Sequence, residues 1–128
     1  MNNKLYKIYL DNNLIGTSAL EKADAPMGVV FGKITFINSN FGFDFWEEYC
    51  KNSKLQANIF SELRALTTPH IEWLSVYSID EKEIKGIGGI YIEGMDTEGY
   101  EITILGIGYP FYEIEFPHHC KNYKDQCL

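Results

Sequence analysis

Residues 20–36, LEKADAPMGVVFGKITF, place two acidic side chains and an Ala-Pro step directly before an apolar, β-branched run. Because a residue before proline is disfavoured in the helical region, the acidic part is predicted to be a loop. Residues 27–37 have strong strand propensity, and Gly28 and Gly32 could mark a bulge or a point where another backbone approaches closely. We predict a central strand here, apolar on both faces, with the rest of the sheet built around it.

The segment before this stretch predicts a β-hairpin. Residues 5–10 alternate with a period of two, and residues 14–18 resume as the return strand. The intervening Asp11-Asn12-Asn13 suits a tight turn, because Asp and Asn tolerate left-handed backbone conformations.

After residue 40 the hydrophobic spacing changes to three and four. Aromatic side chains in residues 45–50 then share one face, with Asp44 as a candidate N-cap and Glu47 in capping-box position. Residues 55–66 continue at helical spacing. The sequence therefore predicts a helical segment over residues 44–66, as one kinked helix or two.

The second half of the chain predicts an antiparallel meander, because short alternating runs are separated by turn signals. The polar tail from Pro117 is expected on the surface. We predict one α+β domain over residues 1–128, with a largely antiparallel sheet of six or seven strands and a helical segment packed on one face. The four strands expected in this half are residues 71–78, 89–93, 100–106 and 111–116.

The charge balance bears on the kind of partner. The chain has 128 residues, enough for a core that needs no disulfide, and acids outnumber bases 18 to 11 for a formal net charge of −7. An acidic chain with a single arginine is a poor candidate for binding nucleic acid, whose affinity comes from phosphate neutralisation. The same charge attracts a basic partner, although solubility alone also explains an acidic surface.

The sequence suggests a cytoplasmic location. Its first ten residues lack the apolar core and cleavage site of a secretory signal, and no window has the length of a membrane span. The three cysteines, Cys50, Cys120 and Cys127, form no dense framework and are expected to be reduced. The oligomeric state is left open.

Four possible zinc ligands occur near the C-terminus: His118, His119, Cys120 and Cys127. Zinc signatures normally contain two close ligand pairs separated by a loop, and adjacent ligands are difficult to direct at one ion. We therefore predict no metal and no cofactor.

Two pairs of side chains could serve an enzyme. His70 and Glu72 lie two apart in a predicted strand and could act as base and orienter, or form an edge-strand salt bridge. Glu21 and Asp24 could divide acid and base roles. No nucleophile, oxyanion hole or phosphate-loop pattern accompanies them, so no catalytic residue is predicted. A small enzyme that uses these four groups is the first alternative.

The acids that follow Tyr77 are the stronger functional candidates. They lie in or beside consecutive loops of the predicted meander, interleaved with tyrosines, and suit a surface that grips a cationic protein. A solvated edge that prevents aggregation explains the same pattern. Glu21 and Asp24 are secondary candidates. The predicted partner-binding residues are Asp80, Glu81, Glu83, Glu93, Asp96, Glu98, Tyr100 and Glu101.

A small, acidic, aromatic-rich chain of this kind resembles the immunity proteins of bacterial toxin systems, including contact-dependent inhibition. Residues 18–36, SALEKADAPMGVVFGKITF, are also similar to a segment of small bacterial proteins in which leucine-acid, proline and Met-Gly-Val follow one another. The resemblance implies a protein that binds and neutralises a cognate, basic toxin domain by occluding its active cleft. A structural or scaffold subunit is the second alternative.

Overall fold

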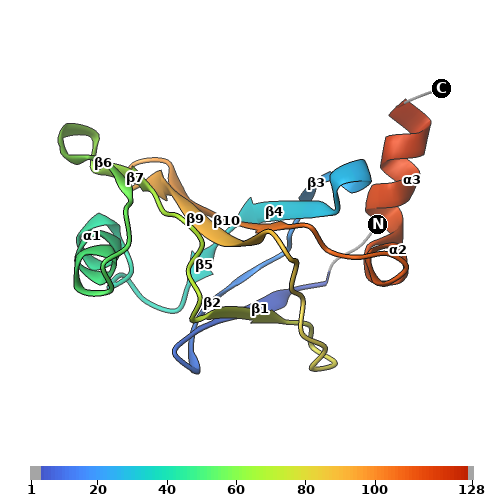
Figure 1. Cartoon of the computed structure of the whole chain (residues 1–128), viewed down its shortest axis with the longest axis horizontal. Coiled ribbons are helices and arrows are strands. Elements are labelled where there is room, and N and C mark those ends of the chain that lie inside the picture. The colour runs from blue at the N-terminus through green and yellow to red at the C-terminus, as the bar shows by residue number, and fades with distance from the viewer. Residues whose placement is uncertain (1–3, 127–128) are drawn as a thin grey trace.

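The alternating segments form two antiparallel sheets that lie face to face in the computed structural model, which describes residues 4–126 (Figure 1). One sheet has four strands and the other has six. The predicted α+β class and antiparallel pairing are confirmed, but the strands are divided between two sheets instead of forming one.

The four-stranded sheet contains the predicted N-terminal hairpin. Asp11 and Asn12 turn the chain with positive φ values of 51° and 69°, which their short polar side chains tolerate. In sheet order its strands are β5 (Thr35–Phe36), β2 (Asn13–Ser18), β1 (Tyr6–Leu10) and β8 (Leu74–Tyr77).

The six-stranded sheet is built around a long hairpin in the second half of the chain, which confirms the strands predicted for residues 89–93 and 100–106. The strand predicted for residues 71–78 is confirmed in part, as β8 of the other sheet. Gly99 begins the return strand with a φ of 88°, a conformation in which glycine has no steric penalty. In sheet order the strands are β3 (Lys22–Asp24), β4 (Val29–Lys33), β10 (Gly99–Leu105), β9 (Gly89–Met95), β7 (Ala65–Thr67) and β6 (Asn58–Phe60).

Residues 20–36 connect the two sheets. A 3-10 turn, η1 (Ala25–Met27), leads into β4, and Ile34 separates β4 from β5 in the other sheet. The single strand predicted for residues 27–37 is therefore wrong in its length. The acidic part before it, predicted to be a loop, instead contains β3, which pairs with β4. The predicted close backbone approaches are confirmed: a Cβ on Gly28 would lie 3.0 Å from the Ile107 nitrogen, and one on Gly32 would lie 2.9 Å from the Leu20 Cα.

The core lies between the facing sheets. Ile8 and Val76 of the four-stranded sheet and Val30, Ile92 and Ile102 of the six-stranded sheet are all fully buried. Each such side chain contributes roughly 1.5–3 kcal/mol when it leaves water. This shared core holds the two layers together.

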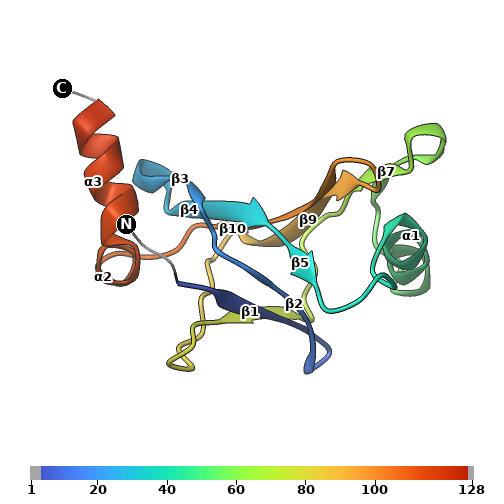
Figure 2. The ribbon, with the colours of Figure 1, turned by 180° about the vertical axis from the view of Figure 1, so that it is seen from behind.

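Helices close the two ends of the sandwich (Figures 1 and 2). At one end, α1 (Phe43–Asn52) buries Trp46, and at the other, α2 (Phe111–Glu115) buries Tyr112. The last helix, α3 (Pro117–Gln126), continues from α2 and rises beside β3.

The helix predicted for residues 44–66 is confirmed only as far as Asn52. The rest forms β6, a second 3-10 turn η2 (Ser61–Leu63) and β7, because pairing of β7 with β9 overrides a local spacing that also suits a helix. The N-cap position is held by Gly42, so Asp44 lies inside the first turn instead of capping it.

One prediction at the C-terminal end is wrong and another is confirmed in part. Residues 111–116, predicted as a strand, contain α2, and buried Tyr112, Glu115 and Phe116 have helical spacing. The tail expected on the surface is exposed at Pro117 and at residues 121–126, but it forms α3, which begins at a proline, as the first helical position allows, and buries His119 and Cys120.

Candidate functional site

The outer face of the six-stranded sheet is covered by no helix within residues 4–126. In β10, Ile102 and Ile104 point into the core while Glu101, Thr103 and Leu105 alternate onto the opposite, half-buried face. The same alternation in the neighbouring strands gives this face a mixture of apolar and charged side chains.

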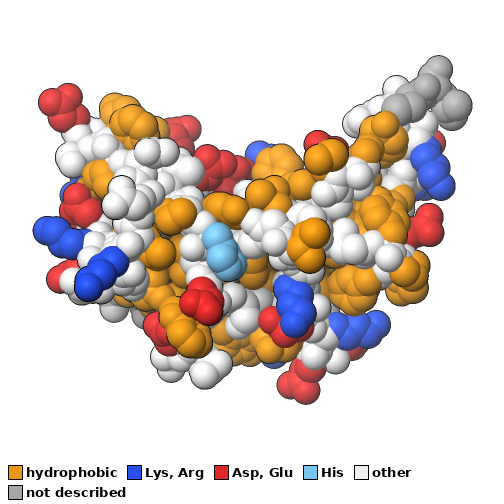
Figure 3. Space-filling view, viewed as in Figure 1, with side chains coloured by type: hydrophobic (Ala, Val, Ile, Leu, Met, Phe, Trp, Pro, Cys, Tyr) orange, Lys and Arg blue, Asp and Glu red, His pale blue; other side chains and the backbone are white. Residues whose placement is uncertain are grey.

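This outer face is concave. It rises to α3 at one end and to the β6–η2 segment at the other, and the space-filling view is hollowed between these ends (Figure 3). Two adjoining clefts occupy the hollow, of about 510 Å³ beside β6–η2 and about 870 Å³ beside α3. We call this surface the concave face, and its charged lining residues are Glu21, Lys22, Asp24, Lys33, Glu93, Glu98 and Glu101.

Both lysines on the concave face are already engaged. Lys22 Nζ lies 2.9 Å from Glu101 Oε2, and the hydrogen bond and charge of Glu101 raise the pKa of Lys22. The ammonium group of Lys33 donates a hydrogen bond to the backbone carbonyl of Glu98. The five carboxylates therefore outnumber the cations, which are not free to neutralise more of them.

Glu93 is the least compensated of these acids. It lies directly opposite Glu101 in the β9–β10 register, and Glu101 is in turn opposite Lys33. Like charges at directly opposed positions destabilise a sheet. Glu93 is exposed, and within residues 4–126 its carboxylate has neither an ion pair nor a hydrogen bond. The fold therefore carries an unpaired negative charge near the centre of the concave face.

The end of the concave face at β6–η2 is apolar. Phe60 and Leu63 are 54% and 61% exposed, and both line the smaller cleft together with Met95. The helical spacing of residues 55–66 includes both side chains and predicts that they lie on the inner face of a helix, which is wrong. We call Phe60 and Leu63 the apolar wall.

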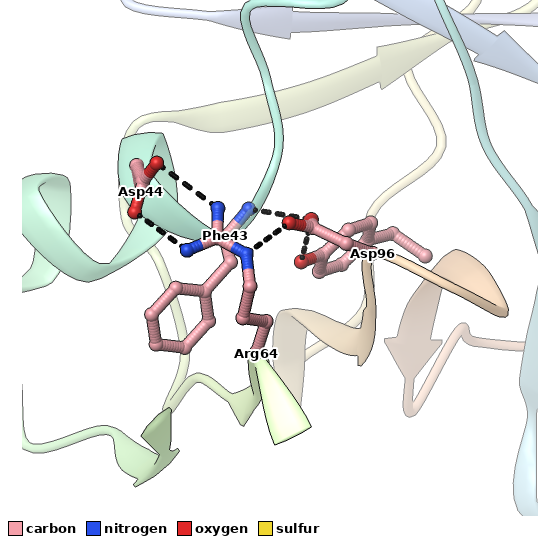
Figure 4. Close-up of polar contacts among 5 residues, drawn as sticks. Phe43, Asp44, Arg64 and Asp96 are labelled. Atoms are coloured by element: carbon pink, nitrogen blue, oxygen red, sulfur yellow. Dashed lines mark hydrogen bonds and ion pairs between the residues drawn. The ribbon is translucent and has the colours of Figure 1, made fainter. Parts of the chain in front are cut away.

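Arg64 holds this wall in place (Figure 4). It ends η2 in a left-handed conformation, with φ 49°, and its side chain binds two carboxylates. Nη1 and Nη2 lie 3.2 and 3.0 Å from Asp44, Nε lies 2.7 Å from Asp96, and the guanidinium also lies over the ring of Phe43. These contacts tie the wall to α1 and to the β9–β10 turn, and they raise the pKa of Arg64 further.

We call the contacts of Arg64 with Asp44 and Asp96 the Arg64 latch, and Asp96 is its central acceptor. Its carboxylate also accepts the backbone N–H of Phe43 and the hydroxyl of Tyr100, each at 2.9 Å. Burial alone would raise the pKa of Asp96, but the hydrogen bonds from Phe43, Arg64 and Tyr100 outweigh it and hold this pKa below its usual value. Burial and the hydrogen bond to Asp96 raise the pKa of Tyr100. The side chains of Asp96 and Tyr100, which the sequence predicts to bind a partner, thus make contacts with other residues of the same chain.

The predicted acids do not form one patch. Glu93, Glu98 and Glu101 lie on the concave face, but residues 80–83 belong to the loop after β8 beside the four-stranded sheet (Figure 1). In that loop the backbone of Glu83 forms an isolated antiparallel β-bridge with Tyr77, and Glu83 Oε1 lies 3.9 Å from Lys85 Nζ. The other two predicted acids of the loop, Asp80 and Glu81, are exposed.

The secondary candidates, Glu21 and Asp24, line the larger cleft on the concave face, where Glu21 Oε2 accepts the backbone N–H of Lys33 at 2.9 Å. His70 and Glu72 do not join them in a common cleft. His70 Nδ1 accepts the backbone N–H of Ile90 at 3.0 Å, and Glu72 lies in a turn before β8. Neither the predicted strand position nor the salt bridge of this pair is found.

The C-terminal histidines and cysteine have internal contacts. His119 Nε2 lies 2.8 Å from the carbonyl of Leu20, and Cys120 Sγ lies 3.7 Å from the Tyr109 hydroxyl. Burial lowers the pKa of His118, with a further contribution from His119. No cluster of three metal-ligating side chains occurs among residues 4–126; Cys127 lies outside the described part of the chain.

No family model, curated protein or solved structure matches this chain. In the described part of the chain, every helix is too short or too polar to cross a bilayer.

The residues that sequence reasoning missed are Arg64, Phe60 and Leu63. The one available signal was that Arg64 is the single arginine of an otherwise acidic chain.

Proposed function

We propose that the protein is an immunity-type inhibitor, which binds the basic domain of a cognate toxin in the bacterial cytoplasm through the concave face. The observation that carries the proposal is the excess of carboxylates on this face, where both lysines are already engaged. Such a surface complements a partner rich in lysine and arginine, and steers its approach.

Inhibition would follow from occlusion. A toxin that acts on a phosphorylated or otherwise anionic substrate presents cations around its cleft, and the carboxylates of Glu93 and Glu98 would occupy the positions of the substrate's charges. The Arg64 latch supports this role, because a surface already fixed by Asp44 and Asp96 loses little conformational freedom on binding.

The test begins with affinity capture from native cells. Glu93→Lys/Glu98→Lys reverses two charges on the concave face, and Glu48→Lys/Glu72→Lys makes the same charge change on exposed residues that line neither of its clefts. The wild type and the control pair should retain a basic protein that the first variant loses. Its retention should weaken as salt is raised.

The captured protein is then expressed with and without the inhibitor. Growth arrest that wild-type protein relieves, and the concave-face variant does not, is the expected result. Capture of no basic protein, or protection by the variant equal to that of the wild type, would overturn the proposal.

A further inference from the structure

We infer that the concave face receives an amphipathic helix of the partner, with an apolar strip against the apolar wall and a basic flank over Glu93. The inference rests on the proposed function and specifies which element of the toxin domain is bound. It follows from the backbone pairing, the apolar side chains and the charges of this face.

The backbone of the concave face has no pairing capacity left at its centre. Strands β4, β10 and β9 each have a neighbour on both sides, so an extended segment lying on them could make no further ladder. At the edges, β3 packs against α3, and β6 is three residues long. A partner on this face must therefore bring its own satisfied backbone, and a helix does so.

The apolar side chains suit a helix with one hydrophobic stripe. Phe60, Leu63 and Met95 line the smaller cleft, and Phe31 and Leu105 line the larger one, so apolar contacts extend across the hollow. A helix that lies in a groove presents residues at spacings of three and four to such contacts. The raised ends at α3 and β6–η2 limit where it can lie (Figure 3).

The charges select a basic helix. Glu93 and Glu98 have no side-chain partner within residues 4–126, while Lys22 and Lys33 are held by Glu101 and by the Glu98 carbonyl. A cation placed beside Glu93 would also relieve its repulsion with the opposing Glu101. An acidic helix would instead add like charges to this face.

Three synthetic peptides test the inference on the full chain. Each has about 18 residues, long enough to form a helix. The first carries leucine along one helical face and lysine along the other. The second has the same composition in an order without helical periodicity, and the third has glutamate in place of lysine. Binding is measured by fluorescence anisotropy at fixed salt, and its location by amide resonance shifts.

The first peptide should bind about tenfold or more tightly than the second, which corresponds to about 1.4 kcal/mol, and the third should not bind. The shifts should fall on β4, β9, β10 and the β6–η2 segment. Glu93→Lys/Glu98→Lys should remove the difference, whereas Glu48→Lys/Glu72→Lys should keep it. Equal binding of the first two peptides, or shifts centred on the four-stranded sheet, would overturn the inference.

These outcomes separate the inference from the proposed function. If the captured toxin domain depends on Glu93 and Glu98 but the helical peptide shows no preference, the inhibitor function stands and the helix is wrong. If the peptide binds as expected but cells provide no toxin, the helix-binding face stands and the inhibitor function is wrong.

Discussion

The carboxylate of Asp96 caps helix α1 across 53 residues of sequence, with Oδ1 accepting the backbone N–H of Phe43 at 2.9 Å. Gly42 holds the N-cap position and has no side chain to supply this acceptor. Because Arg64 and Tyr100 bind the same carboxylate, one side chain joins the helix, the apolar wall and the β9–β10 hairpin.

Replacing Asp96 should therefore destabilise the fold. Asp96→Ala removes the cap and is expected to lower the free energy of unfolding by about 1–2 kcal/mol, and Asp96→Asn by less, because an amide oxygen can still accept from Phe43. Urea unfolding monitored by tryptophan fluorescence measures both. Asp80→Ala, at an exposed loop position, is the matched control and should change little. Equal stability of Asp96→Ala and the control would contradict the cap.

The contribution of Asp96 should depend on pH. Its folded-state pKa is below the unfolded value of about 3.9, so its stabilisation is fully present above that value and is lost as pH falls through the folded pKa. The stability difference between wild type and Asp96→Asn should therefore be constant near neutrality and shrink below about pH 4. Urea midpoints across this pH range provide the measurement; a difference that grows on acidification would be the wrong sign.

Glu93 is predicted to contribute to partner binding while lowering the stability of the fold. Glu93→Lys replaces a like-charge pair with an opposite-charge pair across from Glu101, which should stabilise the sheet by about 0.2–1 kcal/mol. The same change should weaken capture of a basic partner. Thermal unfolding and capture are measured in parallel with Glu48→Lys, an exposed substitution on α1. A less stable Glu93→Lys protein would show that the repulsion does not matter.

Gly28 and Gly108 form a natural comparison. Gly28 has a φ of 66° and its position is crowded by the backbone of Ile107, whereas a Cβ on Gly108 would meet nothing within 4 Å. Gly28→Ala should cost roughly 1–3 kcal/mol through backbone strain and displacement of Ile107. Gly108→Ala should be neutral or slightly stabilising, since it restricts the unfolded chain. Denaturant unfolding of the two variants should separate them clearly.

The parts of the fold predicted from sequence are those whose signals are local. The hairpin formed by β1 and β2 follows from period-two alternation and from Asp11 and Asn12, all within a few residues of one another. The end of α1 at Asn52 could not be found in this way. The residues that follow have helical spacing, and only the pairing of β7 with β9 makes them strands.

The candidate site was predicted in part for the same reason. Glu93, Glu98 and Glu101 come from one hairpin and do lie on one face, as the sequence suggested. The separation of residues 80–83 depends on which sheet β8 joins, and no local pattern records that choice. The Arg64 latch was missed because Asp44 and Asp96 lie 20 and 32 residues from Arg64 in sequence.

Ile34 stands between two strands that belong to different sheets, and this has a consequence for how the molecule comes apart. Neither layer can detach as an independent foldon, because releasing β5 pulls directly on β4, which pairs with β10. Local opening is therefore expected at elements that the crossover does not anchor, such as α3, whereas the β6–η2 segment is held by Arg64 through Asp44 and Asp96. Helix α3 forms one raised end of the concave face, so the surface can adjust at that border while its floor and its opposite end stay fixed.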